Sequence, residues 1–295
     1  MIKVVVLGAA AGGGVPQWNC NCANCRAART TDPDMASTQA SLAVSADGEK
    51  FVLINASPDL RQQIGATPAL HPRGPSLRHS PIEAVVLTNG EVDAVAGLLS
   101  LREGTPFTVF AHRRVLDVLA ENPIFDVLRP GVVDRREIAM DQPFEAAGLT
   151  IESFAVPGKA ALYREDSVAN ETGDTIGLRI TTADGGGPVY VLTACAEIGD
   201  DLRAMLEGAP LVFFDGTLWT DDEMVRLGLS QKTGGRMGHL SMTETMPALD
   251  GLGIGRKVFL HINNSNPALR RGSAERTAAE RAGWQIAGDG MEITL

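Results

Sequence analysis

Three of the four cysteines lie within residues 20–25, as Cys20, Cys22 and Cys25, whereas Cys195 stands alone. Thiolates are zinc ligands, and a closed structural zinc site has four donors in a tetrahedron. A secreted disulfide scaffold is a poor explanation, because a chain of this length does not need one. The spacing predicts a zinc-binding cysteine loop at residues 20–25, with His239, in a polar turn beside a glycine, as the candidate fourth ligand. The alternative is three reduced thiols packed in a loop.

Oxygen-bearing side chains occur at Asn89, Glu91 and Asp93, where an apolar stretch ends and a helical pattern begins. Ligands collect at the carboxyl ends of strands in layered α/β folds. This spacing can bring carboxylates to a cation. A polar helix start capped by Asn89 explains the same residues, so the spacing alone leaves both interpretations open.

His261 follows a second apolar stretch, at residues 257–260, and is itself followed by Asn263 and Asn264. A histidine that leaves a buried strand can serve as a metal ligand or as an acid–base group. A single histidine is more often structural, and asparagines are common in turns. The histidine therefore needs partners from elsewhere in the chain before it predicts a site.

Short apolar stretches and helical patterns alternate along the chain and would position these residues. Expected strands cover residues 4–7, 41–45, 51–55, 84–88, 107–111, 149–156, 175–182, 189–193, 211–214 and 257–260. Expected helices cover residues 58–64, 95–102, 200–206 and 273–282. This alternation predicts a layered α/β fold with mixed sheets. We expect a single domain over residues 1–295, because no linker or low-complexity segment divides the chain.

Composition excludes several classes of protein. The chain has 295 residues, 44% of them hydrophobic and 21% charged, with a formal net charge of −10. These shares are ordinary for a globular protein. The negative charge and the lack of a basic run argue against binding to nucleic acids or anionic membranes. No apolar stretch approaches the roughly 20 residues that span a bilayer, and the N-terminus does not resemble a secretory signal, so we expect a cytoplasmic protein.

Several short segments carry a family resemblance that extends from residue 1 to the C-terminus. They are Gly12-Gly-Gly-Val-Pro-Gln-Trp-Asn-Cys-Asn-Cys22, Asn55-Ala-Ser-Pro-Asp59, Phe214-Asp-Gly-Thr217, Met237-Gly-His239, His261-Ile-Asn-Asn264 and Asp289-Gly-Met. Together they resemble the pyrroloquinoline quinone (PQQ) biosynthesis protein B family of the metallo-β-lactamase-like superfamily. The resemblance implies an αββα sandwich, in which two mixed β-sheets are flanked by helices. It also implies a structural zinc held by Cys20, Cys22, Cys25 and His239.

The usual metal motif of that superfamily, His-x-His-x-Asp-His, is largely lost here. It falls on Asn89, Glu91, Asp93 and Ala94. Only Asp93 matches, and Ala94 also departs from the family, which commonly has a histidine there. A later superfamily histidine is replaced by Lys159, whereas His261 matches the last one. A two-metal centre needs many ligands, so this chain is expected to hold one metal at most.

The resemblance implies a role in making PQQ, a redox cofactor built from a glutamate–tyrosine pair of a peptide. The expected reaction is an iron- and O2-dependent hydroxylation of the tyrosine ring of the peptide-derived precursor. Ferrous iron can activate O2 with few protein ligands. We assign Asp93 and His261 as catalytic residues and Fe(II) ligands, with Glu91, Asn89 and Asp215 as lesser candidates. The alanine at position 94 predicts that iron binds weakly or not at all.

Three further residues are expected to contact the substrate: Asn263, Asn264 and Lys159. Expected partners are the small precursor, other proteins of the PQQ pathway and a second copy of the chain in a homodimer. Two alternative functions remain: a carrier that moves PQQ or its precursor toward the periplasm, and a metal-dependent hydrolase. We rank the hydrolase last because most of the usual metal ligands are absent.

Overall fold

The computed structural model describes residues 1–165 and 169–295, and its strands form two seven-stranded sheets. The first sheet has the order β14-β1-β2-β3-β4-β5-β6, with β1 (Lys3–Gly8), β2 (Ser41–Ser45), β3 (Phe51–Ile54), β4 (Ile82–Val86), β5 (Phe107–Ala111), β6 (Val133–Glu137) and β14 (Glu292–Thr294). The second has the order β13-β12-β11-β10-β9-β8-β7, with β7 (Pro143–Ala146), β8 (Leu149–Ala155), β9 (Ile176–Thr182), β10 (Val189–Leu192), β11 (Leu211–Asp215), β12 (Arg256–Leu260) and β13 (Trp284–Ile286). Strands β3 to β6 run parallel to one another, as do β10 to β13, and the other pairs are antiparallel.

Side chains alternate between the two faces of each sheet. In β1, Val4 and Val6 enter the core between the sheets, whereas Val5 and Leu7 point to the opposite face. In β12, Phe259 likewise points away from the shared core. Because successive side chains of a strand face opposite ways, strands that are apolar at every position must be covered on both faces.

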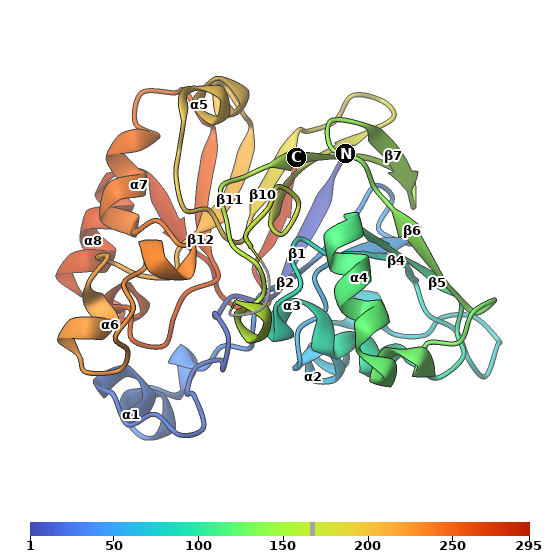
Figure 1. Cartoon of the computed structure of the whole chain (residues 1–295), viewed down its shortest axis with the longest axis horizontal. Coiled ribbons are helices and arrows are strands. Elements are labelled where there is room, and N and C mark those ends of the chain that lie inside the picture. Colours follow the sequence, from blue (N-terminus) through green and yellow to red (C-terminus); the bar gives the residue numbers. More distant parts are fainter. Residues whose placement is uncertain (166–168) are drawn as a thin grey trace.

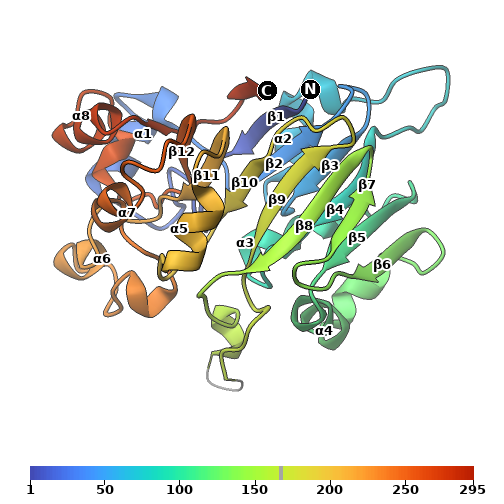
Figure 2. The ribbon, with the colours of Figure 1, turned by 90° about the horizontal axis from the view of Figure 1, so that it is seen from above.

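Helices provide that outer cover, as Figures 1 and 2 show. The first sheet is covered by α2 (Leu60–Ala66), α3 (Val92–Val95) and α4 (Arg113–Glu121), and the second by α5 (Asp200–Leu206), α7 (Met242–Ala248) and α8 (Ala274–Arg281). Two further helices, α1 (Ala23–Arg29) and α6 (Glu223–Arg226), lie near each other at one end of the molecule. The expected αββα sandwich is confirmed.

Several helices and the edge strands of both sheets differ from the sequence prediction. Residues 95–102 were expected to be helical, and the structure has the short α3 followed by a 3-10 segment, Ala96–Leu101. The helices α1, α4, α6 and α7 and the strands β6, β7, β13 and β14 were not predicted. All four strands lie at or next to a sheet edge. Edge strands expose one side to water and carry polar residues, so β6, with only Val133 buried, lacks the apolar pattern.

Strands β4, β11 and β12 direct their carboxyl ends toward the same region, where the two sheets meet. Asp215 ends β11 and pairs with Leu260, so His261 follows directly beside it. The segment after β4 leads into Asp93 from the other sheet. Within the described residues no helix is long and apolar enough to cross a membrane.

Candidate metal centre

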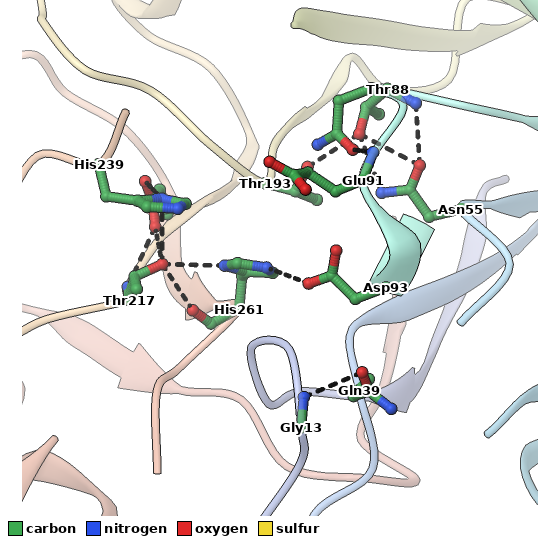
Figure 3. A network of polar contacts seen from close by, with 12 residues as sticks. Gly13, Gln39, Asn55, Thr88, Glu91, Asp93, Thr193, Thr217, His239 and His261 are labelled. Atoms are coloured by element: carbon green, nitrogen blue, oxygen red, sulfur yellow. Dashed lines mark hydrogen bonds and ion pairs between the residues drawn. The ribbon is translucent and has the colours of Figure 1, made fainter. Parts of the chain in front are cut away.

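Asp93 and His261, which lie far apart in the sequence, are in direct contact. Asp93 is in α3 on the first sheet and His261 follows β12 of the second, and Oδ2 of Asp93 lies 2.9 Å from Nε2 of His261 (Figure 3). His261 has a φ angle of 58°, a left-handed conformation that is uncommon for a residue with a side chain. Backbone strain of this kind concentrates at functional sites. The structure thus brings the two predicted catalytic residues together.

Asp215 and His239 extend this contact into a chain of polar groups. The carboxylate of Asp215 is fully buried, and its Oδ2 lies 2.7 Å from Nδ1 of His239. Its Oδ1 accepts hydrogen bonds from the N–H and Oγ1 of Thr217, and its Oδ2 accepts one from the N–H of Cys195. Thr217 Oγ1 also lies 2.9 Å from Nδ1 of His261. One hydroxyl therefore links the carboxylate and the imidazole on neighbouring strands.

The donors of this cluster suit a single metal ion. One ligand atom each of Asp215, His239 and His261 lies within 4.8 Å of the others, and the two imidazole rings are stacked with centroids 5.3 Å apart. Among the described residues, no lysine or arginine pairs with the buried Asp215 carboxylate. A buried carboxylate requires a compensating charge. Two imidazoles and one carboxylate are a donor set for ferrous iron or zinc, so these residues fit a divalent cation, with Asp93 adjacent.

The local charges favour a cation as well. Burial would raise the pKa of Asp93, but its hydrogen bond with His261 and the positive charges of His261 and His239 outweigh burial and lower that pKa below its ordinary value. Burial would lower the pKa of His261. The hydrogen bond with Asp93 and the negative charges of Asp93, Asp215 and Glu91 outweigh burial and raise that pKa above its ordinary value. Neighbouring carboxylates stabilise positive charge at this position, whether it is a proton or a metal ion.

A second polar network connects the sheets above the metal cluster (Figure 3). Thr88, which follows β4, donates its N–H to Oδ1 of Asn55 at 2.8 Å and lies 2.9 Å from the hydroxyl of Thr193, which follows β10. Asn55 adopts a left-handed conformation with φ of 62°, a geometry that asparagine tolerates. These bonds hold the ends of β4 and β10 together beside the cluster.

The lesser ligand candidates have other partners. The Glu91 carboxylate lies 3.3 Å from Nζ of Lys159 and accepts the N–H of Leu162 at 3.0 Å. Oδ1 of Asn89 accepts the N–H of Glu91 at 3.0 Å, as in the capping alternative. Ala94 is buried among the apolar residues on the outer face of the first sheet. Among the described residues, Glu91 does not belong to a group of converging ligand atoms, whereas the remaining lesser candidate, Asp215, does.

The cysteine loop has Asn264 as its neighbour. The amide Nδ2 of Asn264 lies 3.1 Å from Sγ of Cys20, 3.6 Å from Sγ of Cys22 and 3.2 Å from Sγ of Cys25. In a tetrahedral zinc site of ordinary bond lengths, a sulfur and an oxygen ligand are about 3.6 Å apart. The oxygen and nitrogen of an asparagine amide exchange places on a flip. The amide of Asn264 therefore contacts all three sulfurs at close to the separation of neighbouring ligands in such a site.

Two expectations are corrected by this geometry. His239 was expected to complete the cysteine site, but its ring lies against His261 and Asp215 instead. Asn264 was expected to contact substrate, but its side chain points at the cysteines. The reason is the path of the chain after β12: Asn263 faces the pocket, and the next residue faces the opposite side. Asn264 belongs to the segment His261-Ile-Asn-Asn264 of the family resemblance, and this segment was the signal in the sequence that could have pointed to Asn264 as a functional residue.

The metal cluster lies in a pocket of about 840 Å3. Its lining includes Asp93, His239, His261, Asn263, Lys159, Tyr163 and Lys232. Apolar side chains such as Val92, Leu162 and Met237 contribute to the walls. A concave, largely apolar pocket with a few converging polar groups is typical of a small-molecule site. Two of the residues expected to bind substrate, Lys159 and Asn263, are therefore placed where they can do so.

Comparisons with known proteins agree with this architecture. The beta-lactamase superfamily domain matches residues 50–262. "Coenzyme PQQ synthesis protein B" of Rhodopseudomonas palustris (strain ATCC BAA-98 / CGA009) is 59% identical over 309 residues, and that of Xanthomonas oryzae pv. oryzae (strain MAFF 311018) is 52% identical over 302 residues, with 100% of each chain covered. Zn2+-bound PqqB from Methylobacterium extorquens superposes with a TM-score of 0.95 at 48% identity, covering 99% of this chain and 100% of that one.

A more distant structure shares the fold alone. A diphosphatase from the PhnP family is 21% identical, with a TM-score of 0.70 and coverage of 100% of this chain and 98% of that one. The relatives named above, in contrast, match at about half of all positions or more over their whole length. From the fold, the site and these identities together, the chain belongs to the beta-lactamase superfamily and, within it, to the coenzyme PQQ synthesis protein B family.

Proposed function

We propose that this protein acts in PQQ biosynthesis as an iron-dependent hydroxylase of the tyrosine ring of the peptide-derived precursor. The observation that supports it is the convergence of Asp215, His239 and His261, of which the two histidines line the pocket and the aspartate is buried behind them. Two imidazoles and one carboxylate with open positions are the donor set of non-haem iron oxygenases. The sequence similarity to PQQ synthesis proteins supplies the pathway.

His239, His261 and Asp215 would hold the iron, with Asp93 as a further carboxylate beside His261. Bound ferrous iron would supply the activation of O2. Thr217 contacts Nδ1 of the His261 ring and fixes its orientation, so that Nε2, which faces Asp93, would be the nitrogen offered to the metal. The apolar walls of the pocket offer a surface for an aromatic ring and limit the access of water.

We propose a separate structural zinc at the cysteine loop, held by Cys20, Cys22, Cys25 and Asn264. The three sulfurs and the amide surround one point at distances that suit a tetrahedral ion. Such an ion would tie the loop before α1 to the segment that follows β12. It would thereby stabilise the strand end that carries His261.

The experiment is an anaerobic loading with Fe(II), followed by addition of the precursor and O2 and detection of the product that has gained oxygen. We expect product with the unaltered chain and strongly reduced product with His239→Ala, His261→Ala or Asp215→Ala. His71→Ala is the matched control, because the His71 ring contacts a backbone oxygen, that of Gly65, at an exposed position. Stoichiometric binding of the precursor without product would favour the carrier. Product that is independent of iron would contradict the hydroxylase.

A further inference from the structure

Two lysines in the pocket wall each pair with a glutamate. Nζ of Lys159 lies 3.3 Å from Oε1 of Glu91, and the two side chains are 14% and 26% exposed. Nζ of Lys232 lies 2.6 Å from Oε2 of Glu165, and those side chains are 39% and 30% exposed. Both lysines line the same pocket as the metal cluster. They are thus partly shielded from water and reachable from the pocket.

The two pairs lie close to each other and to the metal cluster. The side chain of Lys159 packs against Gly238, which precedes His239 and has a φ angle of 86°. A Cβ atom at that position would lie 3.2 Å from Cγ of the lysine. The hydrogen bond from Lys232 is the largest cause that holds the pKa of Glu165 below its ordinary value, and the charges of Lys159 and Arg236 add to it. Lys232 thus pairs directly with this carboxylate, and the charges of Lys159 and Arg236 act on it as well.

The two ammonium groups have donors to spare. A lysine ammonium carries three N–H donors, and each of these lysines uses one on its glutamate. No other acceptor for Lys159 or Lys232 is found among the residues that the structure describes. Lys159, whose side chain is 14% exposed, is largely shielded from water, whereas Lys232 is 39% exposed. An anion that enters the pocket can accept hydrogen bonds from the unused donors of both.

The lysines also contrast with the charge around them. The chain as a whole carries a formal charge of −10, and the metal cluster contains the carboxylates of Asp93 and Asp215. A divalent ion bound there would offset the charges of those two carboxylates, so an anionic ligand would not be repelled, and the spare donors of Lys159 and Lys232 offer it hydrogen bonds. A ligand that has an acidic part and an uncharged ring can thus place the acidic part on the lysines and the ring toward the metal cluster.

We propose that Lys159 and Lys232 form a carboxylate-binding subsite, in which a ligand carboxylate competes with Glu91 and Glu165 for the two ammonium groups. An incoming carboxylate takes the place of the glutamates or uses the spare donors. Partly exposed ion pairs contribute little to stability, so the exchange is easy. The identity of the natural ligand rests on the proposed function, because a precursor built from glutamate and tyrosine has carboxylates next to an aromatic ring.

The test measures binding of PQQ itself, a tricarboxylate, by fluorescence titration of the zinc-loaded full chain, with the trimethyl ester of PQQ as the uncharged probe. We expect Lys159→Gln and Lys232→Gln each to weaken PQQ binding about tenfold, since each removes hydrogen bonds from a charged donor. Lys159→Arg should restore most of the affinity. Lys50→Gln, which breaks the surface pair of Lys50 with Glu83, should leave it unchanged. The ester should bind all variants alike.

Replacing a glutamate of these pairs should change PQQ affinity in the opposite direction from replacing a lysine. Glu165→Gln removes the internal competitor of Lys232 and should tighten PQQ binding severalfold, whereas a purely structural ion pair predicts unchanged or weaker binding. Unchanged affinity in the double variant Lys159→Gln/Lys232→Gln, with normal thermal melting, would overturn the proposal. Displacement of PQQ by inorganic phosphate at lower concentration than by glutarate would reassign the subsite to phosphate and also overturn it.

The experiments distinguish a failure of the carboxylate-binding subsite from a failure of the proposed hydroxylase activity. Lysine-dependent binding without any hydroxylated product contradicts the hydroxylase and supports the subsite. Hydroxylation in which the double variant Lys159→Gln/Lys232→Gln keeps the KM of the unaltered chain supports the hydroxylase and contradicts the subsite.

Discussion

Replacing Asn264 by alanine should weaken zinc binding at the cysteine loop, whereas replacing His239 should leave it unchanged. The amide of Asn264 lies 3.1 to 3.6 Å from all three thiol sulfurs, and the ring of His239 lies in the other metal group. The two substitutions therefore separate the ligand set expected from sequence from the one that the geometry favours.

The size of the effect follows from the number of ligands. Structural zinc contributes about 10–16 kcal/mol in small metal-dependent domains. Divided among four ligands, one ligand accounts for about 3 kcal/mol, or about a hundredfold in affinity. A water molecule can fill the corner that Asn264→Ala opens and return part of that energy. We therefore expect a loss of about tenfold to a hundredfold.

The assay is a competition for zinc with a chromophoric chelator at neutral pH, combined with thermal melting. Asn264→Asp keeps an oxygen at the same corner and should retain the metal, because carboxylates are zinc ligands. Asn263→Ala is the matched control. Asn263 is the residue before Asn264, but its side chain donates to Ser265 Oγ and lines the pocket, and does not contact the thiols. Release of the loop zinc by His239→Ala, together with unchanged affinity in Asn264→Ala, would refute the geometric argument.

Three further predictions concern the fold and its charges. His261→Gly should be more stable than His261→Ala by about 1 kcal/mol in urea unfolding, because glycine adopts positive φ without strain; equal stabilities would mean that the backbone at this residue is unstrained. Phe213→Ala should cost about 3–5 kcal/mol, since this fully buried ring lies in the core between the sheets; a loss below about 1 kcal/mol in chemical unfolding would contradict that packing. Burial is the largest cause that raises the pKa of Glu223, so the folded chain holds this proton more tightly than the unfolded chain and stability falls as pH rises from the ordinary glutamate value through the raised one. Glu223→Gln should flatten that part of the pH–stability curve, and an unchanged slope would show that another group causes it.

Several features of this protein followed from the sequence alone because they depend on local patterns. Apolar stretches of strand length predicted the central strands of both sheets, including β2 and β5 with their observed bounds. The spacing of Cys20, Cys22 and Cys25 predicted a cluster of thiols, and their side chains do converge. Asp93 and His261 were paired through the family motif, and they lie 2.9 Å apart.

The partners of these residues were decided by the tertiary structure. A sequence lists donor atoms but does not say which of them meet, so His239 was assigned to the sulfurs. In the fold, the N–H of Leu240 donates to the carbonyl oxygen of Cys195 at 2.7 Å, which anchors the turn beside β10 and places the imidazole on Asp215. Asn264 was expected to contact substrate. An asparagine amide is not a typical zinc ligand, so its residue type did not indicate a place beside the three thiols.

Edge strands and ion pairs show the same limit. The strands β6, β13 and β14 gain their hydrogen bonds from a neighbour distant in the chain, whereas β7 forms a hairpin with β8, and all four strands are short or polar. The pairing of Glu91 with Lys159 likewise joins the start of α3 to the segment after β8, from two different sheets. Local propensity and periodicity act over a few residues, whereas the site is formed by the packing of one sheet on the other, which brings residues from both halves of the chain to one point.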